Sequence, residues 1–117
     1  MNSITVSWPD RVLSPNVSAH WRRKSAARKA QRLEAWTLAM QAKVHCPGAP
    51  IDPISIRLDA YPKHERKRDI DNLLASTKGA LDGLAQAMGV DDSLFRPELT
   101  IHPADGTGRI VLTVLPI

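Results

Sequence analysis

The sequence predicts one α/β domain, residues 1–117, in which strands and helices follow in the order β-α-β-α-β-β. Some stretches carry apolar residues at every second position, which indicates strands, and others carry them three or four positions apart, which indicates helices. A turn rich in Gly and Asp separates the last two apolar runs. Alternating strands and helices favour parallel pairing, and the final turn favours an antiparallel hairpin. A mixed sheet with two helices packed on it is therefore expected.

The first half of the chain is predicted to form a strand and a long helix. Residues 4–8 alternate between apolar and hydroxyl side chains, and Pro9 ends this strand. After a loop, a helix is expected from about residue 18 to residue 44. Its core-facing stripe is expected to consist of Leu33, Trp36, Met40 and Val44.

The second half is predicted to form a strand, a helix and two final strands. Residues 54–61 alternate strictly between apolar and polar side chains. A single helix is expected from Asn72 to the stop signal at Gly89, with Leu74, Leu81 and Met88 on one stripe. The last strands are expected at 99–101 and 110–115, joined by the turn over 103–108.

Positive charge is concentrated in two short segments. The formal net charge is +4, and ten of the sixteen Lys and Arg residues lie within 22–32 and 63–68. Such a footprint favours nucleic acid or another polyanion as a partner, although the i, i+4, i+8 stripe on the first helix is also typical of an ordinary solvated face. The residues expected to contact DNA are Arg22, Arg23, Lys24, Arg28, Arg32, Arg66, Lys67 and Arg68.

Several other classes of protein are not indicated. The first eight residues lack a basic start followed by an apolar run, so no secretory leader is expected. No stretch has the apolar length of a membrane span, and the lone Cys46 has no partner for an intrachain disulfide. A cytoplasmic location is expected.

Two pairs of carboxylates flank the second helix. Asp69 and Asp71 come directly after the basic run 66–68, and Asp91–Asp92 follows the helix. Extended backbone points residues i and i+2 to the same side, so Asp69 and Asp71 can aim at one point just before the helix. Asp71 occupies the position expected for the N-cap.

A lysine lies on the same side of the predicted helix. At about 100° per residue, Asp71, Lys78 and Asp82 share a stripe beside the apolar one. Carboxylates from separate segments, with a lysine nearby and a basic run before them, suit a hard cation that holds a phosphate. The bland alternative is that the first pair caps the helix and the second belongs to a turn, as most such aspartates do.

These motifs resemble those of the RusA-type Holliday-junction resolvases. The resemblance covers nearly the whole chain; the D-x-D-N core with the later Asp-Asp is fairly specific, and the N-terminal similarity is looser. It rests on the segments Arg68–Leu73, Lys78, Ala80–Leu84 and Gly89–Asp92, and more loosely on Leu13–Asn16 and His20–Arg22. Members of that family are small dimeric Mg²⁺-dependent endonucleases, common in phages and prophages.

The resemblance implies roles for individual residues. Asp69, Asp71 and Asp92 would be the essential carboxylates and metal ligands, with Asp91 as an alternative ligand. Many members carry a functional lysine four residues after the second aspartate, where this chain has Ala75. Lys78, three residues further along, is the expected replacement.

The expected function is resolution of Holliday junctions by paired nicks, within DNA recombination and repair. Mg²⁺ is the expected cofactor, with Mn²⁺ able to substitute, and the partners are four-way DNA and a second copy of the chain in a homodimer. Two alternatives remain: a non-catalytic DNA-binding module whose aspartates only cap and position, and a metal-dependent nuclease without junction preference.

Overall fold

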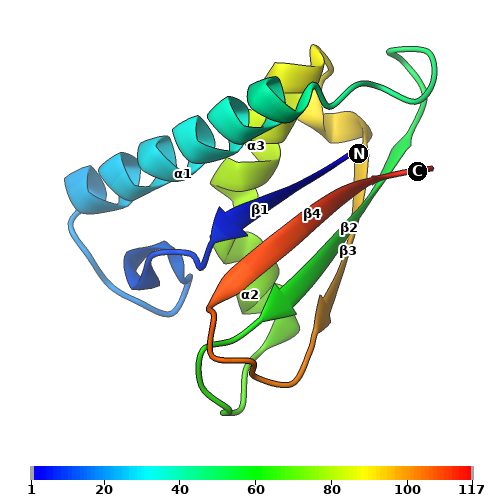
Figure 1. Ribbon diagram of the computed structural model, residues 1–117. Helices are drawn as coiled ribbons and strands as arrows, with labels where there is room; N and C mark the ends of the chain where they lie inside the picture. Colours follow the sequence, from blue (N-terminus) through cyan, green and yellow to red (C-terminus); the bar gives the residue numbers. More distant parts are fainter. Residues whose placement is uncertain (1, 117) are drawn as a thin grey trace.

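A computed structural model describes residues 2–116. Strands and helices alternate along the chain, as expected for the predicted α/β domain (Figure 1). The second predicted helix is divided in two, and two short 3₁₀ turns are added. The elements are β1 Ser3–Ser7, η1 Arg11–Leu13, α1 Trp21–Ala42, β2 Ile54–Tyr61, α2 Ile70–Ser76, α3 Lys78–Met88, η2 Asp92–Leu94, β3 Phe95–Ile101 and β4 Arg109–Leu115.

The sheet is mixed, and its strands lie in the order β1-β4-β2-β3. β2 and β3 are parallel, as the intervening helices require, whereas β4 is antiparallel to both of its neighbours. The predicted hairpin between the last two strands is therefore wrong. Burial explains the order: Ile110, Leu112 and Val114 of β4 are fully buried, which suits a central strand. β3 carries the exposed run Arg96–Glu98, with a proline in the middle, which suits an edge.

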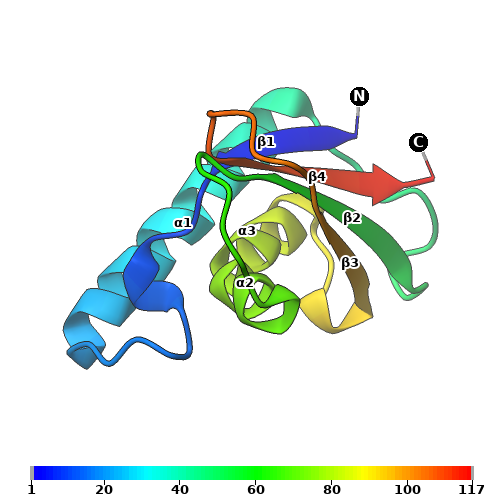
Figure 2. The ribbon, with the colours of Figure 1, turned by 90° about the horizontal axis from the view of Figure 1, so that it is seen from below.

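One face of the sheet holds the core and the other is polar. Ile56 and Leu58 of β2 face the helices and are buried, while Arg57 and Asp59, which alternate with them, point to the opposite face. Figure 2 shows α2 and α3 packed against one side of the strands. None of the helices in the described range 2–116 is long and apolar enough to cross a bilayer.

α1 and α3 approach each other closely because small residues face one another. A Cβ placed on Gly83 would collide with the backbone carbonyl of Arg32 and lie 3.1 Å from the Cβ of Ala35. Within α1 the buried residues are Gln31, Ala35 and Ala39. The helices therefore pack backbone to backbone along this line.

This close packing corrects the predicted core stripe of α1. Leu33 and Met40 are 61% and 51% exposed, and Trp36 is half-buried; only Val44, just beyond the helix, is buried as expected. Leu33 and Trp36 instead line an open hollow of about 680 Å³ on the outer side of α1, next to Gln86 of α3. Large side chains on the buried line would have kept the two helices apart.

The helix predicted over 72–89 is interrupted at Thr77. Its backbone (φ −99°, ψ 6°) leaves the helical region, and its hydroxyl donates to the carbonyl of Leu74 at 2.7 Å. Such side-chain bonds to the backbone compete with helix formation. Lys78 therefore begins a new helix, and positions on either side of Thr77 do not share one continuous stripe.

Candidate functional site

The N-terminus of α2 carries the first pair of carboxylates. Asp69 is the N-cap, and its Oδ1 accepts a hydrogen bond from the backbone N–H of Asn72 at 3.2 Å. Asp71 lies within the first turn and is exposed, so the prediction that Asp71 caps the helix is wrong. The helix begins at Ile70, earlier than expected, so Asp71 is helical and does not share one extended segment with Asp69. Residues two apart at a helix start do not face one another.

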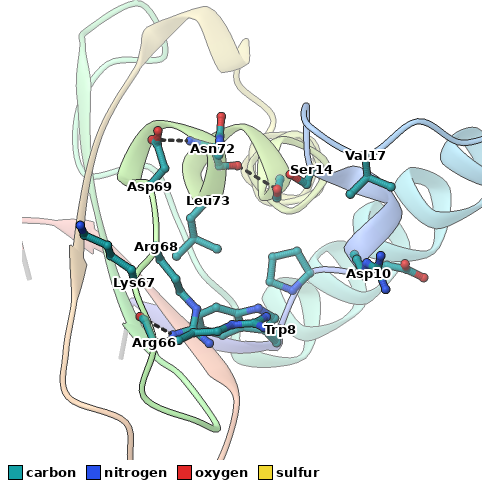
Figure 3. Close-up of a pocket in the computed structure, with 13 residues that line it drawn as sticks. Trp8, Asp10, Ser14, Val17, Arg66, Lys67, Arg68, Asp69, Asn72 and Leu73 are labelled. Atoms are coloured by element: carbon teal, nitrogen blue, oxygen red, sulfur yellow. Dashed lines mark hydrogen bonds between the residues drawn. The ribbon is translucent and has the colours of Figure 1, made fainter.

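The basic run before α2 has one fixed member. The Arg68 guanidinium lies 5.2 Å from the centroid of the Trp8 ring, and its Nη1 donates to the carbonyls of His64 and Arg66 at 3.0 and 3.3 Å. Figure 3 shows Arg68 against Trp8 and Lys67 pointing away from both. Partial burial, and then the neighbouring Arg66, lower the pKa of Arg68 from its ordinary value. Arg66 and Lys67 are exposed.

These residues line an open pocket of about 610 Å³ between the N-terminal segment and α2 (Figure 3). The lining residues are Trp8, Pro9, Asp10, Arg11, Ser14, Val17, Arg66, Lys67, Arg68, Asp69, Asn72, Leu73 and Ser76. Asp69 belongs to the pocket, whereas Asp71 and Asp92 do not line it. The pocket brings together two carboxylates, an aromatic ring and four basic side chains, and the basic side chains with the ring suit a phosphodiester chain.

Sequence reasoning did not single out Trp8, Asp10 or Arg11 as site residues. The sequence predicts Trp8 only as an alternating strand residue, and the stretch that follows Pro9 only as a loop. The looser resemblance of Leu13–Asn16 to the RusA type is the one feature of the sequence that marks this loop, and it does not place the loop near the carboxylates. Ser14 does line the pocket.

The second group of carboxylates lies around Lys78, the first residue of α3 after the break at Thr77. Lys78 Nζ donates to Asp82 Oδ1 at 2.7 Å and also to Asp92 Oδ2. Asp92 lies in η2, and Asp91 caps that turn through a 2.9 Å bond from the Ser93 N–H. The hydrogen bond to Asp82, followed by that to Asp92, raises the pKa of Lys78, and the hydrogen bond from Lys78 lowers the pKa of Asp92. The structure thus joins the predicted Lys78 and Asp92, and adds Asp82.

The basic residues of α1 are distributed around its exposed surface. Arg22, Arg23, Arg28 and Arg32 are exposed and Lys24 is partly so. Arg22 stacks on Trp21, 5.4 Å from its ring centroid. The Arg28 side-chain stem packs at the start of α3, where it would lie 3.3 Å from a Cβ on Gly79. The stem of Arg28 therefore lies against Gly79, the residue that follows Lys78.

The carboxylates can be compared with what a Mg²⁺ ion requires. Across residues 2–116, no three His, Cys, Asp or Glu side chains form a group that could hold a metal ion. Mg²⁺ is commonly bound by one or two carboxylates together with substrate phosphates and water. The accessible oxygens of Asp69, Asp71 and Asp92 have that donor chemistry. The structure does not bring these three side chains together as one such group, and their convergence on one ion stays a prediction.

Comparison with known proteins identifies a relative without assigning an activity. No family model matches the sequence. An "Uncharacterized protein" of Xylella fastidiosa (strain Temecula1) is 34% identical over 119 residues, an alignment that covers all of this chain and 78% of the relative. At this identity and coverage, the chain belongs to the same family as the Xylella fastidiosa protein.

Proposed function

We propose that this protein is a Mg²⁺-dependent endodeoxyribonuclease of the RusA type, which resolves four-way DNA junctions by paired nicks. The observation that carries the proposal is the pocket at the start of α2. There the Asp69 carboxylate shares one open surface with Arg11, Arg66, Lys67 and Arg68. A cluster of cations beside a carboxylate suits a site that binds a polyanion, because the phosphates of the polyanion neutralise the cations on binding.

Arg68 supports the binding half of the proposal. A guanidinium stacked on an indole and held by two carbonyls loses little further freedom when it takes up a phosphate. It would position the DNA backbone beside Asp69. The exposed Arg66 and Lys67, and Arg22, Arg23, Lys24, Arg28 and Arg32 of α1, would add affinity that depends on salt.

The residues that would hold Mg²⁺, or Mn²⁺ in its place, are Asp69, Asp71 and Asp92, with Asp91 as an alternative ligand. When bound, the ion would supply a water of lowered pKa and neutralise phosphate charge. Lys78 would offset negative charge that builds on the phosphate during cleavage. Asp92 and Lys78 are already in contact, so these two roles would be exercised at one place.

Paired nicking asks for two copies of the site. A junction has near two-fold symmetry, and one chain of this size offers one set of these carboxylates. A homodimer with C₂ symmetry would supply the second set in the matching orientation. Such a substrate would also place the protein in the cytoplasm.

A second candidate function has its own observation. Asp69 caps α2 through the N–H of Asn72, a structural role that needs no catalysis. A DNA-binding module would then use the same basic pocket without cleaving its ligand. A nuclease without junction preference is a third possibility, which the pocket equally accommodates.

The test is cleavage of a synthetic four-way junction and of a linear duplex, each with and without Mg²⁺. We expect Mg²⁺-dependent paired nicks in the junction alone. Asp71→Asn should nearly abolish cleavage and leave junction binding intact, whereas Asp52→Asn, in the linker before β2, is the matched control and should cleave normally. Tight junction binding with no cleavage at any divalent concentration would establish the binding module. Equal cleavage of both DNAs would establish the general nuclease.

A further inference from the structure

The pocket at the start of α2 contains apolar surface beside its charged side chains. Leu73 of α2, Pro9 and Val17 line it together with the Trp8 ring. In Figure 3 the Leu73 side chain points from α2 toward Trp8. Contacts to phosphates are made by cations and by hydrogen-bond donors, so apolar side chains add nothing to them. This part of the pocket therefore suits a different group of the ligand.

Trp8 and Arg68 together supply a flat wall for such a group. The guanidinium lies 5.2 Å from the centroid of the indole ring, and two backbone carbonyls accept its hydrogen bonds. Neither side chain is fully buried, so both keep surface that a ligand can reach. Unpaired nucleobases stack on aromatic rings and on guanidinium planes alike. The wall therefore has the chemistry of a base-stacking surface.

The size and the charge of the pocket agree with a nucleotide. Its volume of about 610 Å³ falls within the range of roughly 300–1,000 Å³ that is usual for pockets that enclose organic ligands. Three exposed cations, Arg11, Arg66 and Lys67, belong to the lining and can neutralise phosphates. The carboxylates of Asp10 and Asp69 repel phosphates but accept hydrogen bonds, which the amino groups of bases donate. One base between its two phosphates offers all of these groups.

We propose that this pocket binds one unpaired nucleobase of the DNA, stacked on Trp8 and Arg68, while the cations of the lining bind the phosphates on either side. This inference rests on the proposed function, because it names the part of the DNA that enters the site. Taking a base out of a duplex costs its pairing and its stacking, and the cost is least where the duplex is already disturbed. A base at the branch point of a junction is easier to unpair than one inside a linear duplex. The pocket would thereby favour the junction.

The experiment measures binding alone, in EDTA, so that neither a metal ion nor cleavage enters the result. Fluorescence anisotropy compares two short labelled single strands of equal length, one normal and one with every base removed to leave abasic sites. Their phosphates are the same, so the ratio of the two dissociation constants isolates the contribution of the bases. The normal strand should bind about 5- to 150-fold more tightly, the range expected for stacking one base.

Three variants locate the stacking surface. Trp8→Leu keeps an apolar side chain but removes the ring, and should bring the ratio close to one. Val17→Trp fills the pocket and leaves Trp8 and Arg68 unchanged, and should lower the ratio in the same way. Trp21→Leu is the matched control and should keep the wild-type ratio, because Trp21 is 67% exposed at the start of α1 and has Arg22 over its ring at 5.4 Å. Circular dichroism checks the fold of each variant, and Val17→Trp carries the test if Trp8→Leu does not fold.

Each result decides the question. A ratio that Trp8→Leu and Val17→Trp both reduce supports the base site. Equal, salt-dependent binding of the two strands by the wild type overturns it and leaves the phosphate-binding surface of the proposed function standing. A ratio that is lost in Trp21→Leu and kept in Trp8→Leu also overturns it, because the bases would then stack at the start of α1. If the wild type binds neither strand nor the four-way junction, the inference and the proposed function fall together.

Discussion

The guanidinium of Arg68 lies over the ring of Trp8, 5.2 Å from its centroid, and joins the loop before α2 to the end of β1. Two backbone carbonyls accept hydrogen bonds from the same guanidinium. Arg68 is therefore fixed in place, in contrast to the exposed Arg66 and Lys67 beside it. This difference makes one basic residue of the run testable separately from its neighbours.

Arg68→Lys should weaken binding of the four-way junction although the charge is kept. An ammonium cannot form the same planar stack or the same pair of bonds to carbonyls. In anisotropy titrations over a range of salt concentrations, Arg68→Lys should show a weaker affinity, with little change in the slope of log affinity against log salt concentration. Arg68→Ala should lower the magnitude of that slope by about one, the value for one lost phosphate contact. Lys67→Arg is the control and should match the wild type. An Arg68→Lys protein with wild-type affinity would show that charge alone matters here.

Asp69 can be tested for its capping and catalytic roles one at a time. Asn is as good an N-cap as Asp, so Asp69→Asn should retain stability, whereas Asp69→Ala should lose about 0.5–2 kcal/mol of the free energy of unfolding. Urea denaturation measures this difference. Under the proposed function, Asp69→Asn should nevertheless lose cleavage. Full cleavage by the stable Asp69→Asn protein would reduce Asp69 to a cap.

Gly83→Ala should destabilise the protein. An exposed helical Gly→Ala change ordinarily gains up to about 1 kcal/mol, but here the new Cβ would collide with the Arg32 carbonyl. Forcing α1 from α3 should cost about 1–3 kcal/mol, measured by chemical denaturation. Gly48→Ala, in the linker before β2, meets only the flexible Asp52 side chain at 3.2 Å and should change stability little. A neutral or stabilising Gly83→Ala would contradict the close helix contact.

The Lys78–Asp92 pair should contribute to stability only at intermediate pH. The pKa of Asp92 is lowered, so its contribution is present above the unfolded value of about 3.9 and is lost as pH falls through the folded pKa. The pKa of Lys78 is raised, so its contribution is present below about 10.4 and is lost as pH rises through the folded pKa.

Wild type and Lys78→Met should therefore differ by no more than about 1 kcal/mol near neutral pH, because both groups are partly exposed. The difference in unfolding free energy should shrink as pH falls toward 2 and as pH rises toward 11, and 1 M NaCl should narrow it at pH 7. A difference that persists unchanged at pH 2 would mean that Lys78 acts through packing and not through charge.

Local periodicity was enough to predict β1, β2 and β4 to within a residue at each end, whereas the strand predicted over 99–101 is only the end of β3, which begins at Phe95. Residues 54–61 alternate strictly, and β2 has those bounds. The strand order could not be predicted from the sequence. The sequence of a turn such as 103–108 does not distinguish a hairpin from a connection that passes a neighbouring strand. The exposed Arg96–Glu98 run, set against the buried Ile110, Leu112 and Val114, was the usable clue to which strand is central.

The helices show where apolar periodicity misleads. α1 buries Ala35 and Ala39 and exposes Leu33, because its contact with α3 depends on small residues and not on large ones. The break at Thr77 arises from one side-chain hydrogen bond, which no apolar stripe reveals. In the candidate site, the pairing of Lys78 with Asp92 joins separate segments, and only the fold brings them together.

The central position of β4 also governs when this fold can be completed. β4 pairs with β1 through contacts such as Ser3 with Thr113, and with β2 on its other side. Contacts between residues so far apart in sequence are slow to form. A ribosome also releases β4 after every other described element. Until then the inner edges of β1 and β2 have no partner, so a nascent chain would expose two open strand edges. Among the described strands, the one that is synthesised last is the one that joins β1 to β2.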